Sequence, residues 1–338
     1  MAPHRSVLSS ASGWDESAAV GPHILECELD LEFTPEPHDQ SHEPAHPPRT
    51  SLFDVFAGEH GLRAGWRLTL YVALVVLLTF LSGFVASLFP QLFRGNTGMG
   101  AFFFQEIGGF VVVSAAALFM ARLEGRSPGV FGLPLRGAFG EKFWMGAIFG
   151  LGEISLLIGA IALAGGYSFG PLALGTRDLL LWALVWTVFF LFVGLFEEFL
   201  FRGYAQFTLA DGIGFWPAAI LLSLAFGAIH LRNPGEDWLG AASVAATGLL
   251  FALVLRRTGN LWMAVGWHAS FDFGETFLFS VPNSGAQFRG HLSAATLHGP
   301  TWLTGGAPGP EASIFSFIVL GLAAFAVHKL YPRANATG

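Results

Sequence analysis

The chain has 338 residues, of which 53% are hydrophobic and only 12% are Asp, Glu, Lys or Arg. Soluble globular domains carry about 25% charged residues, so this composition excludes an ordinary water-soluble enzyme. The net charge of −7 offers no basic surface for nucleic acid, and the single cysteine, Cys27, excludes an intramolecular disulfide. A mean hydropathy of +0.57 is typical of a helical protein that crosses a membrane several times.

Residues 1–60 differ in composition from the rest of the chain. They hold eleven acidic residues against two arginines, together with many His and Pro residues and no long apolar run. Such a segment cannot bury enough apolar surface to fold, so we expect a disordered, acidic, cytoplasmic tail over 1–60. The irregular spacing of its histidines does not indicate a metal site. The remaining residues, 61–338, form the predicted membrane domain.

Eight apolar stretches in this domain are long enough, or nearly so, to cross a bilayer as helices of about 20 residues. The sequence therefore predicts an all-α fold, a polytopic transmembrane helix bundle of about eight spans. Small residues in the fifth and sixth stretches, which are short, predict that neighbouring helices shield them. The eight stretches are 66–89, 101–121, 143–164, 179–204, 215–231, 238–255, 261–281 and 312–331.

Loop charges predict the orientation of these spans. If the N-terminal tail is cytoplasmic, eleven Lys and Arg residues flank the spans on the inner side and four on the outer side. Positively charged loops stay in the cytoplasm, so we expect both termini inside. An even number of spans agrees with this assignment. We expect an integral protein of the bacterial inner membrane.

Ionisable residues inside membrane spans are costly, and each is therefore a functional candidate. In this chain they cluster in three motifs, on the fourth, fifth and seventh spans: LFEEFLFRGY, LAFGAIHL and GWHASFDFGE. The residues concerned are Glu197, Glu198, Arg202, Phe226, His230, His268 and Asp272.

Helical spacing distinguishes the two glutamates of the first motif. Glu198 and Arg202 are four residues apart and can form an ion pair along the helix. Glu197 points about 100° away from Glu198 and can face a cavity shared with the other two motifs. For Glu197 to reach the depth of His230, we expect the fourth helix to continue past Gly203. Histidines and a free carboxylate on three helices can activate a water and stabilise an oxyanion.

These motifs resemble those of a known protein family. EEFLFR matches EExxxR, FGAIH matches FxxxH, and HASFD matches HxxxN/D, in the order found in the CPBP family of CAAX proteases and bacteriocin-processing intramembrane proteases. The likeness covers about 179–274, which makes 61–338 a CPBP-type protease domain. It implies an intramembrane endopeptidase that hydrolyses membrane-associated or prenylated (CAAX-type) substrates. Its partners are then the lipid bilayer and a protein or peptide substrate, with no nucleic acid.

The resemblance also implies roles for the individual residues. Glu197 becomes the general base that activates water, assisted by His230, while His268 and Asp272 occupy the place of an oxyanion-stabilising pair. Glu198 and Arg202, with Phe226, support the site structurally. An ionised Asp cannot donate a hydrogen bond, so Asp272 is expected either to be protonated or to orient His268.

The resemblance leaves two interpretations of the cofactor. A Glu/His/His set would suit a catalytic zinc held by Glu197, His230 and His268. The sequence lacks the HExxH pattern typical of zinc proteases, and we favour a metal-free site.

Two rival functions use the same residues. Buried carboxylates and histidines also mark ion pathways, so a transporter or proton relay is one alternative. The spans show no obvious internal repeat, which disfavours it. An inactive, protease-like scaffold is the other, although the motifs are intact. Glu106 and Glu153, isolated on the second and third spans, are expected to form hydrogen bonds between helices.

Overall fold

The computed structural model of the protein describes residues 56–58, 61–90, 99–287 and 289–332. The predicted tail over 1–60 lies outside these residues except at its end. There β1 (Ala57–Gly58) pairs with β2 (Gly61–Leu62) as an antiparallel ladder.

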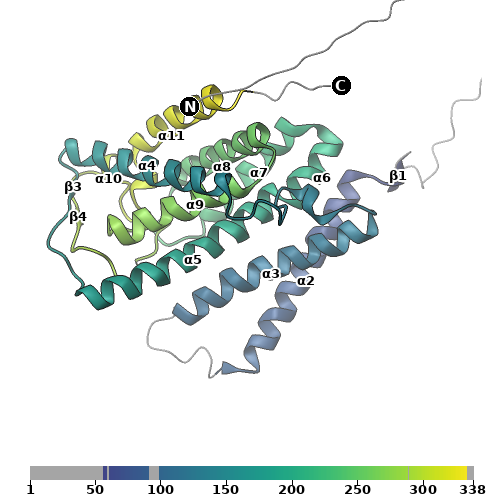
Figure 1. Cartoon of the computed structure of the whole chain (residues 1–338), viewed down its shortest axis with the longest axis horizontal. Coiled ribbons are helices and arrows are strands. Elements are labelled where there is room, and N and C mark those ends of the chain that lie inside the picture. The colour runs from purple at the N-terminus through teal and green to yellow at the C-terminus, as the bar shows by residue number, and fades with distance from the viewer. Residues whose placement is uncertain (1–55, 59–60, 91–98, 288, 333–338) are drawn as a thin grey trace, which may run out of the picture. The chain divides into compact units, whose positions relative to one another are not determined.

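Each of the eight predicted apolar stretches contains a helix, and the predicted all-α fold is confirmed (Figure 1). The eight helices are α2 (Ala64–Ser87), α3 (Met99–Leu123), α4 (Glu141–Leu163), α5 (Thr176–Arg202), α7 (Phe215–His230), α8 (Trp238–Thr258), α9 (Trp262–Phe273) and α11 (Ile314–Leu330). Smaller elements connect them: η2 (Pro128–Phe131), β3 (Tyr167–Ser168), α6 (Tyr204–Ile213), η3 (Gly274–Leu278), β4 (Thr296–Leu297), α10 (Thr301–Thr304) and η4 (Pro310–Ala312).

The count of eight full spans is not confirmed. Among the described residues, five helical segments are long and apolar enough to cross a membrane: α2, α3, α4, α8 and the continuous stretch Thr176–Ile213. The sixth predicted span, α8, is therefore longer than expected. By contrast α7, α11 and α9 have only 16, 17 and 12 residues. At 1.5 Å per residue, α9 is about 18 Å long, shorter than the hydrocarbon core of about 30 Å.

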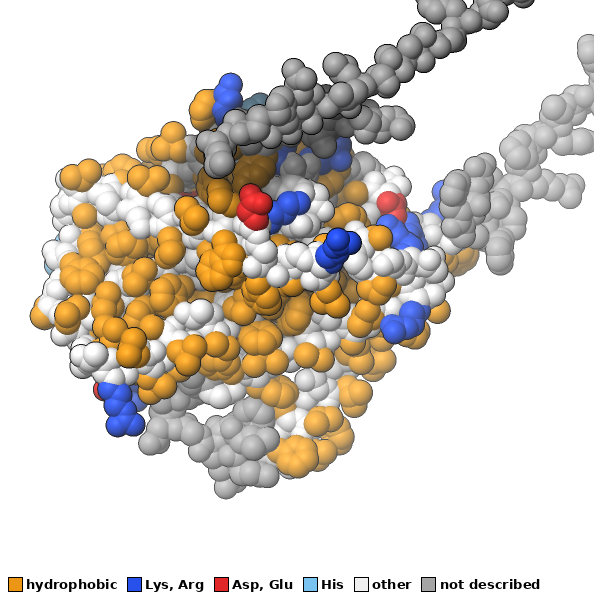
Figure 2. Space-filling model, in the orientation of Figure 1, with side chains coloured by type: hydrophobic (Ala, Val, Ile, Leu, Met, Phe, Trp, Pro, Cys, Tyr) orange, Lys and Arg blue, Asp and Glu red, His pale blue; other side chains and the backbone are white. Residues whose placement is uncertain are grey.

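Side chains on the outer surface suit contact with lipid. Figure 2 shows hydrophobic side chains over the middle of the visible face, with charged side chains toward its upper and outer edges. Large apolar side chains such as Phe80 on α2 and Leu163 on α4 are 75% and 93% exposed. A soluble monomer does not expose so extensive an apolar surface. The chain is an integral membrane protein.

Glycines bring α9, which carries the third motif, close to its neighbours. A Cβ added to Gly146 would lie 2.0 Å from the Met263 carbonyl oxygen, and one added to Gly150 would lie 2.2 Å from that of Trp267. Small residues at such crossings let helix backbones approach closely. The short α9 therefore packs against α4, and it also contacts α5 and α8. Because neighbouring helices surround α9, it does not have to be long enough to span the membrane by itself.

The fourth predicted span continues past Gly203, as expected from the depth of the motifs, but with a break. Gly203 has φ −81° and ψ −128°, which lies outside the helical region, and α6 begins at Tyr204. A Cβ at Gly203 would lie 2.3 Å from the Phe199 carbonyl oxygen. The chain thus bends where the first motif ends.

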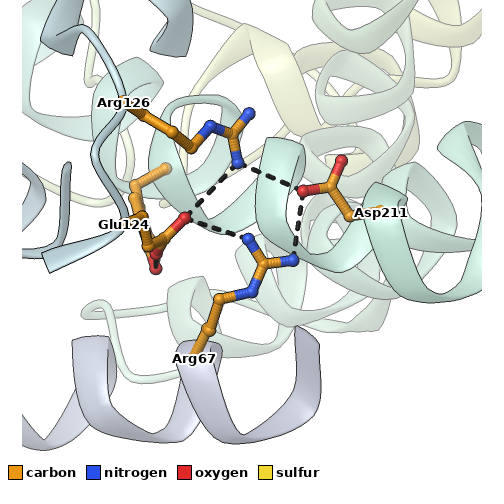
Figure 3. A network of polar contacts seen from close by, with 5 residues as sticks. Arg67, Glu124, Arg126 and Asp211 are labelled. Carbon is orange, nitrogen blue, oxygen red and sulfur yellow. Dashed lines mark hydrogen bonds and ion pairs between the residues drawn. The ribbon is translucent and has the colours of Figure 1, made fainter. Parts of the chain in front are cut away.

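An ion-pair network attaches α6 to the first two helices (Figure 3). Arg67 of α2 contacts Glu124 at 2.9 Å and Asp211 of α6 at 3.1 Å. Arg126 contacts the same two carboxylates at 3.5 and 3.1 Å. The Tyr204 hydroxyl donates to the other oxygen of Glu124. These contacts fix the helix that follows the first motif against α2 and the end of α3.

Candidate active site

A cavity of about 620 Å³ lies inside the bundle, between α3, α4, α5, α7, α8, α9 and the segment 283–311. All four residues predicted to be catalytic line it: Glu197 of α5, His230 of α7, and His268 and Asp272 of α9. The structure thus brings the three motifs to one place. Phe226 also lines the cavity, whereas the other two predicted supporting residues lie behind its wall.

Glu198 and Arg202 form the ion pair that their spacing predicts. Arg202 Nη1 donates to Glu198 Oε1 at 3.1 Å, and both side chains are essentially inaccessible to solvent. The same Glu198 oxygen lies 3.0 Å from Nδ1 of His268. A carboxylate oxygen can only accept a hydrogen bond, so Nδ1 carries the proton in this contact. Glu198 therefore connects the arginine to the third motif, a contact that the sequence analysis missed.

The other ring nitrogen of His268 faces the cavity. Its Nε2 lies 3.8 Å from Glu197 Oε2 and 3.6 Å from Asp272 Oδ2. Both distances are longer than a hydrogen bond, so neither carboxylate is hydrogen-bonded to Nε2. A water molecule or a substrate atom can bridge each gap. Asp272 therefore does not hold the ring from behind. Glu198 does so, through Nδ1.

His230 presents its own Nε2 to the cavity. Its Nδ1 lies 2.8 Å from the Phe226 carbonyl oxygen, which can only accept, so Nδ1 donates. In the neutral ring this leaves a lone pair on Nε2. The Phe226 ring packs edge-on against the imidazole, with 4.7 Å between the ring centroids. His230 is thus oriented as a proton acceptor.

Aromatic rings surround the buried guanidinium of Arg202. It lies 4.4 Å from the centroid of the Phe226 ring, a distance typical of a cation–π contact. A Cβ at Gly248 of α8 would lie 2.6 Å from Arg202 Nη2, so the glycine leaves room for the guanidinium. The Phe226 ring therefore packs against both Arg202 and His230.

The three residues that would hold a zinc, Glu197, His230 and His268, do not form a metal site as they are placed. Within the described residues, no group of three His, Cys, Asp or Glu side chains converges closely enough to hold an ion. Glu197 and His268 are adjacent, but His230 contacts neither of them within ion-pair distance. The donor set does not fit zinc in this arrangement.

Part of the chain matches a known protein family. Residues 178–274 match the family model described as type II CAAX prenyl endopeptidase Rce1-like. This segment, called the Rce1-like segment below, is similar to that family. The predicted resemblance to the CPBP family is thereby confirmed. The Rce1-like segment runs from the first turn of α5 to the end of α9 and contains all three motifs. No curated protein and no solved structure matches the chain.

Three further carboxyls line the cavity, all from outside the Rce1-like segment. Glu153 of α4 accepts from the indole N–H of Trp267, which confirms its predicted role between helices. Glu106 of α3 instead bonds Gln105 of its own helix, at 3.2 Å, so the prediction for it is wrong. Glu311 belongs to η4, and nothing in the sequence connects it with the motifs. An isolated acid in an apolar span was the only signal that could have indicated Glu106.

Two carboxyls outside the spans, Glu236 and the cavity-lining Glu311, interact electrostatically. Burial raises the pKa of Glu236, between α7 and α8, to about 7, and the charge of Glu311 adds to this effect. Burial also raises the pKa of Glu311, although the N–H of Ser284 donates to its Oε1 at 2.8 Å and opposes the shift. His230 opposes both shifts electrostatically. Glu236 therefore changes its protonation state near neutral pH.

Proposed function

We propose that the protein is an intramembrane endopeptidase that cleaves membrane-associated or prenylated (CAAX-type) peptides with a water nucleophile. The observation that carries this proposal is that Glu197, His230, His268 and Asp272, from three separate helices, line one cavity within an Rce1-like segment. We favour hydrolysis over a transporter or proton relay because the three motifs meet at one cavity within the segment that matches a peptidase family.

Water activation falls to Glu197 in this proposal. The gap between its Oε2 and His268 Nε2 is 3.8 Å, which suits a water held by both. Glu197 accepts a proton from this water as its oxygen attacks the substrate carbonyl carbon. The carbonyl π electrons move to oxygen and form a tetrahedral oxyanion.

The two histidines act on the oxyanion and on the leaving amine. With Nδ1 donating to Glu198, His268 carries an N–H on Nε2 as well when its ring is protonated; this Nε2–H has no hydrogen-bond acceptor within the described residues and can donate to the oxyanion. When the C–N bond breaks, its electron pair stays on nitrogen, which takes the proton first removed from water. His230, with its free Nε2, can relay that proton between Glu197 and the amine. A protonated Asp272 adds a second donor beside His268.

Glu198 and Arg202 act behind the cavity wall as positioning residues. Their ion pair fixes Glu198 Oε1, and that oxygen fixes the ring of His268. A preorganised donor stabilises a developing charge better than one that must first rotate into place. We place the protein in the bacterial inner membrane, and we propose that it works without a bound metal.

The direct test is cleavage by the purified protein in detergent. The substrate is a fluorescence-quenched peptide that ends in a prenylated cysteine, two aliphatic residues and a free carboxylate. We expect two product masses that differ from the substrate by one added water. An intact peptide after prolonged incubation with a folded, monodisperse protein contradicts the proposal.

A second measurement concerns the metal. We expect activity to persist in excess chelator and the purified active protein to contain no stoichiometric zinc. Loss of activity to the chelator, with recovery on adding zinc, contradicts the metal-free proposal and leaves the protease assignment standing.

A further inference from the structure

The cavity lining is rich in acidic side chains. Its lining includes five carboxyl side chains and two imidazoles, but no Lys or Arg among the described residues. Arg202 lies behind the wall, paired with Glu198. The lining carboxyls are Glu106, Glu153, Glu197, Asp272 and Glu311. A cleft lined by one sign of charge, with walls of low polarity, favours ligands of the opposite sign.

Four of these carboxyls have partners within the protein, two through hydrogen bonds and two through the nearby ring of His268. Trp267 donates to Glu153, and the N–H of Ser284 donates to Glu311 at 2.8 Å. The remaining two, Glu197 and Asp272, face the imidazole of His268.

Glu106 is different. Its side chain is 7% exposed, and only Oε1 has a partner, the neighbouring amide of Gln105 at 3.2 Å. Its Oε2 is buried and has no hydrogen-bond partner in the part of the chain that the structure describes. A buried carboxylate oxygen without a donor is costly, so it provides a strong site for a donor that arrives with a ligand.

A cationic ligand group satisfies this site best. The cavity next to Glu106 is walled by aromatic and aliphatic side chains of α5, among them Val193 and Phe196. Ion pairs that are shielded from water discriminate between partners more sharply than exposed pairs. A lone divalent cation is a poorer occupant, because no three carboxyl or imidazole groups among the described residues converge on one point.

We propose that the cavity selects peptides that carry a Lys or Arg side chain close to the scissile bond, and that Glu106 is the ion-pair partner of that side chain. This inference rests on the proposed protease function and specifies its substrate class. Glu106 lies on α3, outside residues 178–274, so the family match assigns it no role.

The test compares matched peptides. Lys or its uncharged isostere norleucine is placed at each of the three positions before the prenylated cysteine and at the final position of a quenched peptide. For the wild type we expect kcat/KM to be at least about tenfold higher for Lys at one position, with the difference mainly in KM. In Glu106→Gln the preference falls to about twofold or less. Glu106→Arg should instead cleave peptides with Glu at that position in preference to peptides with Lys.

Glu141→Gln is the matched control, because it removes one carboxylate from an exposed position at the start of α4, away from the cavity. It should keep the Lys preference of the wild type. Glu106→Asp retains the charge and should keep part of the preference, which covers the case in which Glu106→Gln does not fold. Equal cleavage of Lys and norleucine peptides by the wild type overturns the inference alone. Cleavage of no peptide at all counts against the protease function, and the inference fails with it.

Discussion

Glu198 lies 3.0 Å from His268, through Oε1 and Nδ1, and the same oxygen accepts from Arg202 at 3.1 Å. One carboxylate oxygen thus joins the first motif to the third. This contact fixes which nitrogen of His268 faces the cavity, and the same side chain is the ion-pair partner of the buried guanidinium. The adjacent Glu197 is left free for chemistry.

Glu198→Gln should therefore lower both stability and activity. The change leaves the Arg202 charge buried without its counter-ion, a loss on the order of 3 kcal/mol, and it loosens the His268 ring. We expect a clearly lower melting temperature in detergent and a reduced kcat with KM little changed. A variant with wild-type melting and full kcat would show that the contact supports neither the fold nor the site.

The approach of α4 to α9 gives a second prediction. Gly150→Ala places a Cβ 2.2 Å from both the Trp267 carbonyl oxygen and Ser270 Oγ, so α9 must move away. Overpacking of this kind costs about 1–3 kcal/mol and should also reduce cleavage, because α9 carries His268 and Asp272. Gly152→Ala is the matched control: it lies on the exposed side of the same helix, with nothing within 4 Å. Equal melting temperatures for the two variants would contradict the assigned crossing.

The pH dependence of stability should change in Glu236→Gln. Burial raises the pKa of Glu236 from 4.5 to about 7, so the folded state favours the protonated form. Its contribution to stability is present at low pH and is lost as the pH rises through about 7. We expect the melting temperature of the variant, relative to the wild type, to increase by a few degrees between pH 5 and pH 8.5. A constant difference over this range would exclude a raised pKa.

Orientation in the membrane is tested by labelling intact cells. We expect the loop after α8 to face the cytoplasm, because Arg256 and Arg257 contribute to the excess of inner positive charges. Arg256→Cys places an exposed thiol in the last turn of α8, beside this loop, and Cys27→Ser removes the natural thiol. The thiol should resist an impermeant reagent until the cells are opened. Strong labelling of closed cells would reverse the predicted topology.

The positions of the helices follow from the sequence because long apolar runs have few alternatives in a membrane. Each predicted stretch contains a helix. The number of full spans does not follow from the sequence, because an apolar stretch can contain a helix that is too short to cross the membrane. The sequence predicts one span over 261–281, yet α9 ends at Phe273 and the next residues form the π-helix η3. Its burial by Gly146 and Gly150 depends on tertiary contacts that periodicity does not reveal.

The candidate site also has features that the sequence predicts and features that depend on tertiary contacts. Spacing along one helix is enough to predict the pair of Glu198 with Arg202. The contact between Glu198 and His268 joins residues 70 positions apart, and local spacing carries no information about it. Glu106 and Glu311 reach the cavity only through the packing of α3 and the loop before α11. Sequence patterns therefore indicate the motif residues and miss those that complete the cavity.

The most direct test of the account is the kcat of Glu197→Gln for a prenylated, quenched peptide, measured beside wild type and Glu141→Gln. Glutamine keeps the shape of the side chain but cannot accept the proton of the attacking water, and a general base contributes about 10²- to 10⁴-fold to the rate. We expect a loss of kcat in that range with an unchanged melting temperature, while Glu141→Gln cleaves at the wild-type rate. Cleavage by Glu197→Gln at the wild-type rate would contradict it.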